Sequence, residues 1–147
     1  TFSQKALLEA ENLILASSFD TAIVRLGGIY GPGRAKLLEE ILSKTKRLNA
    51  KDFYSNRIYQ SDAVNILLHL MTLSKGIGLV NGVDTQPSPM NEIIRWLSQS
   101  LSIELEEIQV ESACTNKQVS ALKLANTGFK WQYPSFKEGF GELISLR

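Results

Sequence analysis

The strongest constraint in the sequence is an apolar strand that ends abruptly in four glycines and a proline. The run Ala22–Val24 favours a strand, and the ten residues from Arg25 to Arg34 then read RLGGIYGPGR. Glycine lacks the Cβ that holds a ligand or a neighbouring chain away, and Pro32 cannot continue a strand ladder. The pattern predicts a strand end at which the backbone approaches a ligand, with a plain tight turn as the alternative.

The composition indicates a single domain spanning residues 1–147. The chain is 44% hydrophobic and 21% charged, which suits one core and excludes a disordered protein. A net charge of +1 gives no electrostatic reason to expect a nucleic acid or a membrane as partner. The basic residues Lys44, Lys46, Arg47 and Lys51 are interpreted as a solvated helix end.

Cysteine content and hydropathy restrict the site chemistry and the location. Cys114 is the single cysteine, which excludes an internal disulfide and a cysteine-rich metal site. Neither a signal-like segment nor an apolar run of about 18 residues occurs, so we expect a cytoplasmic protein. His69 has no cysteine or acid at ligand spacing, so it is interpreted as a core or helix-face residue and no metal is expected.

Helical and strand patterns alternate along the chain, which predicts an α/β fold. Apolar spacing and end signals favour helices over residues 3–18, 35–44, 62–73, 88–101, 120–125 and 135–146, and extended segments over residues 21–26, 57–60, 78–83 and 108–110. Ser61 or Asp62 is expected to cap the third helix. Only two strands are strongly apolar, so we expect the rest of the sheet to come from residues before Thr1 or from another chain.

Four segments, in this order, resemble a single protein family. They are AIVRLGGIYGPGR at residues 22–34, NRIYQSDAVNILLHL at 56–70, LVNGVD with SPMNEIIRWLSQSL at 79–101, and NKQVSALKLANTGFKWQYPSFKEGF at 116–140. Together they resemble the C-terminal half of an extended short-chain dehydrogenase/reductase of the NAD-dependent epimerase/dehydratase family. The resemblance implies the C-terminal part of a Rossmann-like NAD(P)-binding fold plus a small α/β substrate lobe. The N-terminal glycine-rich nucleotide-binding half would be absent.

The resemblance places the cofactor beside the glycine-rich strand end. The glycines do not form the G-x-G-x-x-G turn that seats a dinucleotide pyrophosphate. By resemblance, the backbone of Leu26, Gly27, Gly28 and Ile29 lies instead near the nicotinamide. We expect NAD or NADP in the parent protein, and no tight binding of either cofactor by this chain alone.

The resemblance implies catalysis by a Tyr-x-x-x-Lys pair, in which the tyrosine is the general acid/base and the lysine lowers the pKa of the tyrosine. Lys5 is the candidate for this lysine, with an ordinary exposed helical lysine as the alternative. Thr1 stands four residues earlier, where the tyrosine would be. The acid/base tyrosine is therefore not expected within this chain.

The resemblance also implies contacts to an anionic, nucleotide-linked sugar. Arg57 is interpreted as a diphosphate ligand, with a surface ion pair as the alternative, because a guanidinium matches phosphate oxygens in a bidentate fork. The better-known sugar epimerases carry their arginine two positions earlier, where this chain has Ser55. Arg34 and Lys117 are further cationic candidates. Tyr30 is expected beside the turn, where it packs or contacts substrate.

Two other parts of the resemblance concern packing. Asp62 keeps the acid of the family's aromatic-His-Val-Asp-Asp segment, and the residue is equally well explained as the helix cap. Trp131, Tyr133, Pro134 and Phe136 resemble the closing segment of the family and are interpreted as a structural aromatic cluster.

Two functions are compatible with the sequence. The first is the substrate-binding half of an NAD(P)-dependent sugar-nucleotide epimerase, dehydratase or reductase, inactive as the isolated fragment. The alternative is a non-catalytic binding or assembly module with the short-chain-dehydrogenase fold, which the missing tyrosine favours. The first helix resembles the one through which extended family members dimerise, so a homodimer is expected.

Overall fold

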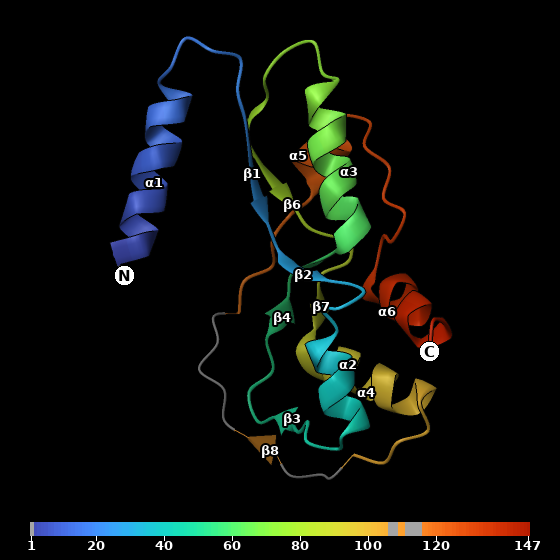
Figure 1. The fold of residues 1–147 in the computed structure, drawn as a ribbon. Helices are drawn as coiled ribbons and strands as arrows, with labels where there is room; N and C mark the ends of the chain where they lie inside the picture. Colours follow the sequence, from blue (N-terminus) through green and yellow to red (C-terminus); the bar gives the residue numbers. More distant parts are fainter. Residues whose placement is uncertain (1, 106–108, 111–115) are drawn as a thin grey trace.

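The computed structural model describes residues 2–105, 109–110 and 116–147, and helices are interspersed with short strands along the chain (Figure 1). The helices are α1 (Phe2–Leu15), α2 (Lys36–Leu42), α3 (Gln60–Met71), α4 (Met90–Ser100), α5 (Leu122–Ala125) and α6 (Phe136–Ser145). The strands are β1 (Ala22–Leu26), β2 (Gly28–Tyr30), β3 (Leu48–Asn49), β4 (Tyr54–Ser55), β5 (Arg57–Tyr59), β6 (Gly78–Gly82), β7 (Ser88–Pro89) and β8 (Gln109–Val110). The predicted helices and the two strongly apolar strands are confirmed, with ends that differ by a few residues.

The described strands pair two by two. β1 and β6 are parallel, with Val24 opposite Val80, and β2 and β5 are parallel, with Ile29 opposite Ile58. β3 pairs with β8 in parallel, and β4 pairs with β7 in antiparallel orientation. The predicted strand at residues 108–110 is therefore present as β8, while Ile108 lies outside the described residues. The sequence missed β2, β3, β4 and β7, because strands of two or three residues are too short to show a period.

The β2–β5 ribbon lies between two apolar cores, because successive side chains on a strand point to opposite faces. Ile58 belongs to the sheet core, which comprises Ile58, Ala63, Ile66, Val80, Leu124 and Phe129. Tyr30 and Tyr59 belong to the lobe core, which comprises Tyr30, Leu37, Leu38, Ile41, Leu48, Tyr59, Ile93, Ile94, Leu97, Phe136, Phe140 and Leu143. Figure 1 shows β2 at the junction between the group of β1, β6, α3 and α5 and the group of α2 and α4.

Aromatic rings join the C-terminal segment to this ribbon. Tyr133 stacks on Tyr59 with 3.9 Å between ring centroids, and Tyr30 stacks on Phe140 at 4.6 Å. Phe136 meets Trp96 of α4 edge-on at 5.6 Å. The predicted structural role of the closing aromatic segment is confirmed.

Asp62 connects the same C-terminal segment to α3. Its side chain is fully buried, and its two carboxylate oxygens accept hydrogen bonds from the backbone N–H groups of Gln132 and Tyr133 at 3.0 and 2.8 Å. The N-cap residue of α3 is Tyr59, without a side-chain capping bond. The predicted cap by Ser61 or Asp62 is therefore wrong, because the carboxylate binds distant backbone donors instead.

We predict that Asp62→Ala lowers the free energy of unfolding by about 2–5 kcal/mol, because it leaves two N–H groups without their buried acceptor. Urea unfolding followed by circular dichroism measures the change. Asp20→Ala is the matched control, since Asp20 is exposed and its replacement should change stability by less than about 0.5 kcal/mol. Equal effects of the two substitutions would contradict the role of Asp62.

Two glycines of α6 offer a second test of the packing. A Cβ on Gly139 would overlap the hydroxyl group of Tyr30, whereas a Cβ on Gly141 would meet nothing within 4 Å. We predict that Gly139→Ala destabilises the protein by about 1–3 kcal/mol through overpacking. Gly141→Ala should stabilise it by about 0.5–1 kcal/mol, because alanine favours the helix. The midpoints of thermal unfolding should move in opposite directions, and a shift in the same direction would refute this packing.

α1 stands beside β1 in Figure 1 and exposes much of its apolar surface. Leu7 and Leu13 are 67% and 75% exposed, and Phe19 in the following loop is 80% exposed. The Nε of Arg25 on β1 donates to Glu11 Oε1 at 2.9 Å, which connects the helix to the strand. In the described part of the chain, none of the helices has the length and apolar character needed to cross a membrane.

Candidate functional site

The candidate site lies where the parallel strands β1 and β6 end. Parallel strands open their carboxyl ends at one edge, and ligands of open α/β sheets bind outside that edge. Gly27 follows β1 and donates its N–H to Gly82 O at 2.9 Å, and the next N–H, from Gly28, reaches Asn56 O at 2.9 Å. The end of the sheet and the beginning of the β2–β5 ribbon therefore meet at Gly27 and Gly28, the two residues that we call the glycine turn.

Two glycines of the segment from Gly27 to Gly33 are needed, one for packing and one for backbone conformation. A Cβ on Gly27 would lie 2.8 Å from Asn56 O and 2.9 Å from Val83 Cγ1, closer than real side chains allow. Gly33 has a φ of +72°, which favours glycine. Gly28 is exposed, so the backbone there is open to a ligand. Close approach of the backbone is thus confirmed for Gly27, whereas contact with a ligand stays a prediction.

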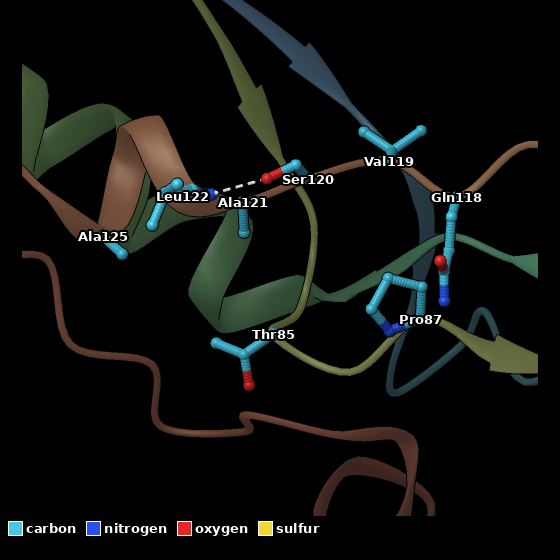
Figure 2. Close-up of a pocket in the computed structure, with 8 residues that line it drawn as sticks. All are labelled: Thr85, Pro87, Gln118, Val119, Ser120, Ala121, Leu122 and Ala125. Carbon is cyan, nitrogen blue, oxygen red and sulfur yellow. Dashed lines mark hydrogen bonds between the residues drawn. The ribbon is translucent and has the colours of Figure 1, made fainter.

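A pocket of about 430 Å³ opens at the same edge (Figure 2). Its lining residues are Thr85, Pro87, Gln118, Val119, Ser120, Ala121, Leu122 and Ala125. They come from the loop after β6, from the segment before α5 and from α5, and Figure 2 shows the side chain of Gln118 extending toward Pro87. None of these side chains is charged, so the lining suits a neutral group and any anionic group would need cations from outside it.

Hydrogen bonds to neighbouring segments hold both walls of the pocket. On one side, Thr85 Oγ1 donates to Pro134 O at 2.8 Å, and the indole N–H of Trp131 donates to Val83 O at 2.9 Å. On the other side, the Asn81 side chain donates to Ser120 O at 3.3 Å. The C-terminal segment that Asp62 anchors therefore also supports the loop after β6.

Asn56 connects the glycine turn to the pocket. Its side-chain Nδ2 donates to Lys117 O at 2.8 Å, and its Oδ1 accepts from Val119 N at 2.7 Å. Its backbone carbonyl accepts from Gly28, as described above. Sequence reasoning missed this residue, although it directly precedes Arg57 in a segment that carries the family resemblance.

Arg57 is half-buried on β5 with its guanidinium against apolar groups. Its Nη2 lies 3.7 Å from Met90 Sδ, and its Cζ lies 5.9 Å from the ring centroid of Phe140. Among the described residues, the buried Nε has no hydrogen-bond acceptor, and no carboxylate lies within ion-pair distance of the side chain. Burial lowers the pKa of Arg57. The described residues thus give no support to the alternative of a surface ion pair, and the diphosphate contact stays a prediction.

The structure brings together some of the predicted site residues and separates others. Gly28, Arg57 and Lys117 all lie next to Asn56, and the Lys117 side chain is exposed. Lys5 is exposed on α1, and Arg34 is exposed after its own N–H closes the turn onto Gly31 O at 2.9 Å. Among the described contacts, none joins Lys5 or Arg34 to the Asn56 group.

Tyr30 is a core residue with 3% of its surface exposed. Its ring packs in the lobe core, and burial, the main cause, raises the pKa of its hydroxyl, with a smaller effect from Asp84. The burial supports the packing role for Tyr30 and not the predicted contact with substrate. His69 is likewise structural, since its Nε2 lies 2.9 Å from Thr127 Oγ1 and its ring contacts Phe129.

Asp84 is a buried acid in the loop between β6 and β7, residues 83–87, which we call the pocket loop. It is 3% exposed, its Oδ1 accepts from Gln86 N at 3.2 Å, and its N–H donates to Arg57 O at 2.7 Å. Burial raises the pKa of its carboxyl to about 7, against the opposing effects of the Gln86 hydrogen bond and of Arg57. Sequence reasoning missed Asp84, although an acid directly after an apolar strand is the signal that could have found it.

The comparisons with known proteins identify the fold. Searches of protein-family models and of curated proteins each returned no match. A structure reported as an inferred NAD-dependent epimerase/dehydratase from Methylobacillus flagellatus has a TM-score of 0.81 and 27% identity, and the match covers 99% of this chain and 54% of that chain.

Two further structures have the same fold at lower identity. A human epimerase family protein, solved with NADPH, has a TM-score of 0.73 and 19% identity over 88% of this chain and 50% of that chain. The UDP-glucose 4-epimerase from Thermotoga maritima, solved with UDP-glucose, has a TM-score of 0.71 and 16% identity over 97% of this chain and 52% of that chain.

The fold is therefore that of the Rossmann-like α/β proteins. Within this class, the chain has the fold of the NAD-dependent epimerase/dehydratase family, as the four sequence segments predicted. It spans about half the length of the structures that it matches.

We predict that Asp84 makes stability depend on pH. A carboxyl whose pKa is raised from 3.8 to about 7 on folding binds its proton more tightly in the folded state. The contribution of Asp84 to the free energy of unfolding should therefore fall as pH rises from about 4 to 7, by up to about 1.4 kcal/mol per pH unit. Above about pH 7 this contribution should stay constant. Urea unfolding of the wild type and of Asp84→Asn at several pH values isolates the effect. A constant difference between the two proteins from pH 4 to 7 would contradict it.

Proposed function

We propose that the chain forms the substrate side of an NAD(P)-dependent enzyme that acts on a nucleotide-linked sugar as an epimerase, dehydratase or reductase. The observation that carries the proposal is the meeting of the glycine turn and the uncharged pocket at the carboxyl edge of β1 and β6. Support comes from the shared fold, since similar structures were solved with NADPH and with UDP-glucose.

A cofactor would lie along the open backbone of the turn. Leu26 is 37% exposed and Gly28 is exposed, so these residues offer the nicotinamide an accessible surface. The bound cofactor would supply the hydride chemistry. The chain's own contribution is to orient the substrate: the pocket holds a neutral part, and Arg57 and Lys117 provide cations for a diphosphate. Arg34 and Lys5 stay weaker candidates, as cations exposed on other elements.

The rest of the cofactor site would come from further residues on the free side of β1. Among the described residues, β1 pairs only with β6, so its other edge offers unpaired backbone groups. Beside it lies a hollow of about 550 Å³ whose lining includes Val24, Leu67, Leu70 and Met71. We propose that the chain is the C-terminal half of a longer protein whose N-terminal half covers this edge and binds the dinucleotide. We also propose that this longer protein is located in the cytoplasm.

Calorimetric titration with NAD⁺ and with NADPH tests this proposal. The longer protein that we propose should bind one of the two cofactors with micromolar affinity. The chain alone should bind neither tightly, because it carries no G-x-G-x-x-G turn. Micromolar binding by the chain alone would contradict the division of the site, and no binding by the longer protein would refute the function.

We predict that Arg57→Ala in the longer protein weakens UDP binding by about 10- to 100-fold, the value of a lost charge-assisted hydrogen bond. Arg57→Lys should lose less, because it keeps the charge without the fork. Arg95→Ala is the matched control, since Arg95 is exposed on α4 outside the site. UDP affinity that is equal in the Arg57→Ala and Arg95→Ala variants would exclude Arg57 from the site.

The exposed apolar surface of α1 favours a second candidate, a non-catalytic assembly module that pairs through this helix. Leu7 and Ile14 are seven residues apart and therefore share one face of α1, and they are 67% and 44% exposed. Exposed apolar side chains that gather on one face are typical of an interaction surface. In this case the longer protein would dimerise and turn over no nucleotide sugar. Sedimentation equilibrium and a turnover assay distinguish the two candidates, and a strict monomer would count against the assembly module.

A further inference from the structure

We propose that Asn56 is a positioning residue that couples two parts of the site. One is the cofactor edge, which is the glycine turn at the carboxyl ends of β1 and β6, and the other is a wall of the substrate pocket. The proposal rests on the proposed function, because it needs both ligands to bind at this edge. The wall in question is the strap, residues 116–121, which belongs to no helix or strand and contributes Gln118 to Ala121 to the pocket.

The first contact of Asn56 is with the cofactor edge. The backbone carbonyl oxygen of Asn56 accepts a hydrogen bond from the Gly28 N–H at 2.9 Å. The same oxygen lies 2.8 Å from the position that a Cβ of Gly27 would occupy. No gap separates the glycine backbone from the Asn56 peptide. A ligand that presses on or orders this backbone therefore also fixes the Asn56 peptide.

The second contact is with the strap. Nδ2 donates to Lys117 O at 2.8 Å and Oδ1 accepts from Val119 N at 2.7 Å, so a single amide group satisfies two backbone groups that flank Gln118. Gln118 and Val119 both line the pocket. The orientation of the Asn56 amide therefore sets how far these two residues extend into it.

Only an amide performs this role with both hydrogen bonds intact. An aspartate accepts from Val119 N but has no hydrogen to donate to Lys117 O, and an alanine makes neither bond. Asn81 provides a matched control, because its amide also holds the strap, through Ser120 O at 3.3 Å, but extends from β6. Among the described hydrogen bonds, none joins Asn81 to the glycine turn, whereas the backbone carbonyl of Asn56 accepts from Gly28.

The experiment measures the coupling between the two ligands in the longer protein. UDP affinity is determined by calorimetry with and without saturating NAD⁺ for the wild type, Asn56→Ala, Asn56→Asp and Asn81→Ala. NAD⁺ should change UDP affinity by about 5- to 30-fold in the wild type, within the usual range of coupling between sites. The change should fall to less than about 2-fold in Asn56→Ala and persist in Asn81→Ala. Asn56→Asp should lie between.

Each outcome decides the question. Wild-type coupling that persists in both Asn56 variants, or that falls equally in Asn81→Ala, would overturn the role of Asn56, as would a wild type that binds both ligands without coupling. These results would leave the proposed function intact, because both ligands still bind. Binding of neither NAD⁺ nor UDP by the folded wild type would overturn both proposals. Thermal unfolding of each variant shows that it is folded, and Asn56→Asp supplies the test if Asn56→Ala does not fold.

Discussion

The structure depends on the three-residue β2–β5 ribbon, which has to serve two cores at once. Strand geometry sends Ile29 and Ile58 to the sheet side and Tyr30 and Tyr59 to the lobe side. A slip of one residue in either strand would exchange the two sets, and it would bury the tyrosine hydroxyls among aliphatic side chains. The register of β2 against β5 therefore fixes the position of the sheet core relative to the lobe core. The shape of the pocket at their junction depends on the same register.

Long-range polar contacts then secure what the ribbon has aligned. The Asp62 carboxylate holds the backbone at Gln132 and Tyr133, and Pro134 in turn accepts both donors of Thr85. The pocket loop is thus connected to α3 through a segment about 70 residues away in sequence. A fully buried carboxylate is favourable here because both of its oxygens accept backbone hydrogen bonds.

Sequence reasoning recovered the features that repeat or that alter the backbone locally. The helices show an apolar stripe, and Gly27 and Pro32 interrupt a strand, so both kinds of feature are visible in a single chain. It failed for residues whose structural role depends on partners that are distant in the sequence. Asp62 looks like a helix cap until Gln132 is placed beside it, and Asn56 shows no local pattern because its partners lie about 60 residues away. The orientation of Arg57 toward Phe140 depends on α6 in the same way.

In the part of the chain that the structure describes, the strap contributes no ladder hydrogen bonds to a sheet, so the lining of the pocket can change without changing the strand pairing. Substitutions at Gln118 or Ala121 change the shape and polarity of the pocket, while the β1–β6 pairing and both cores keep their contacts. Such positions are free to diverge at little cost in stability. One scaffold can therefore acquire new ligand preferences by exchanging a few residues of the strap, provided that the asparagines holding the strap are kept.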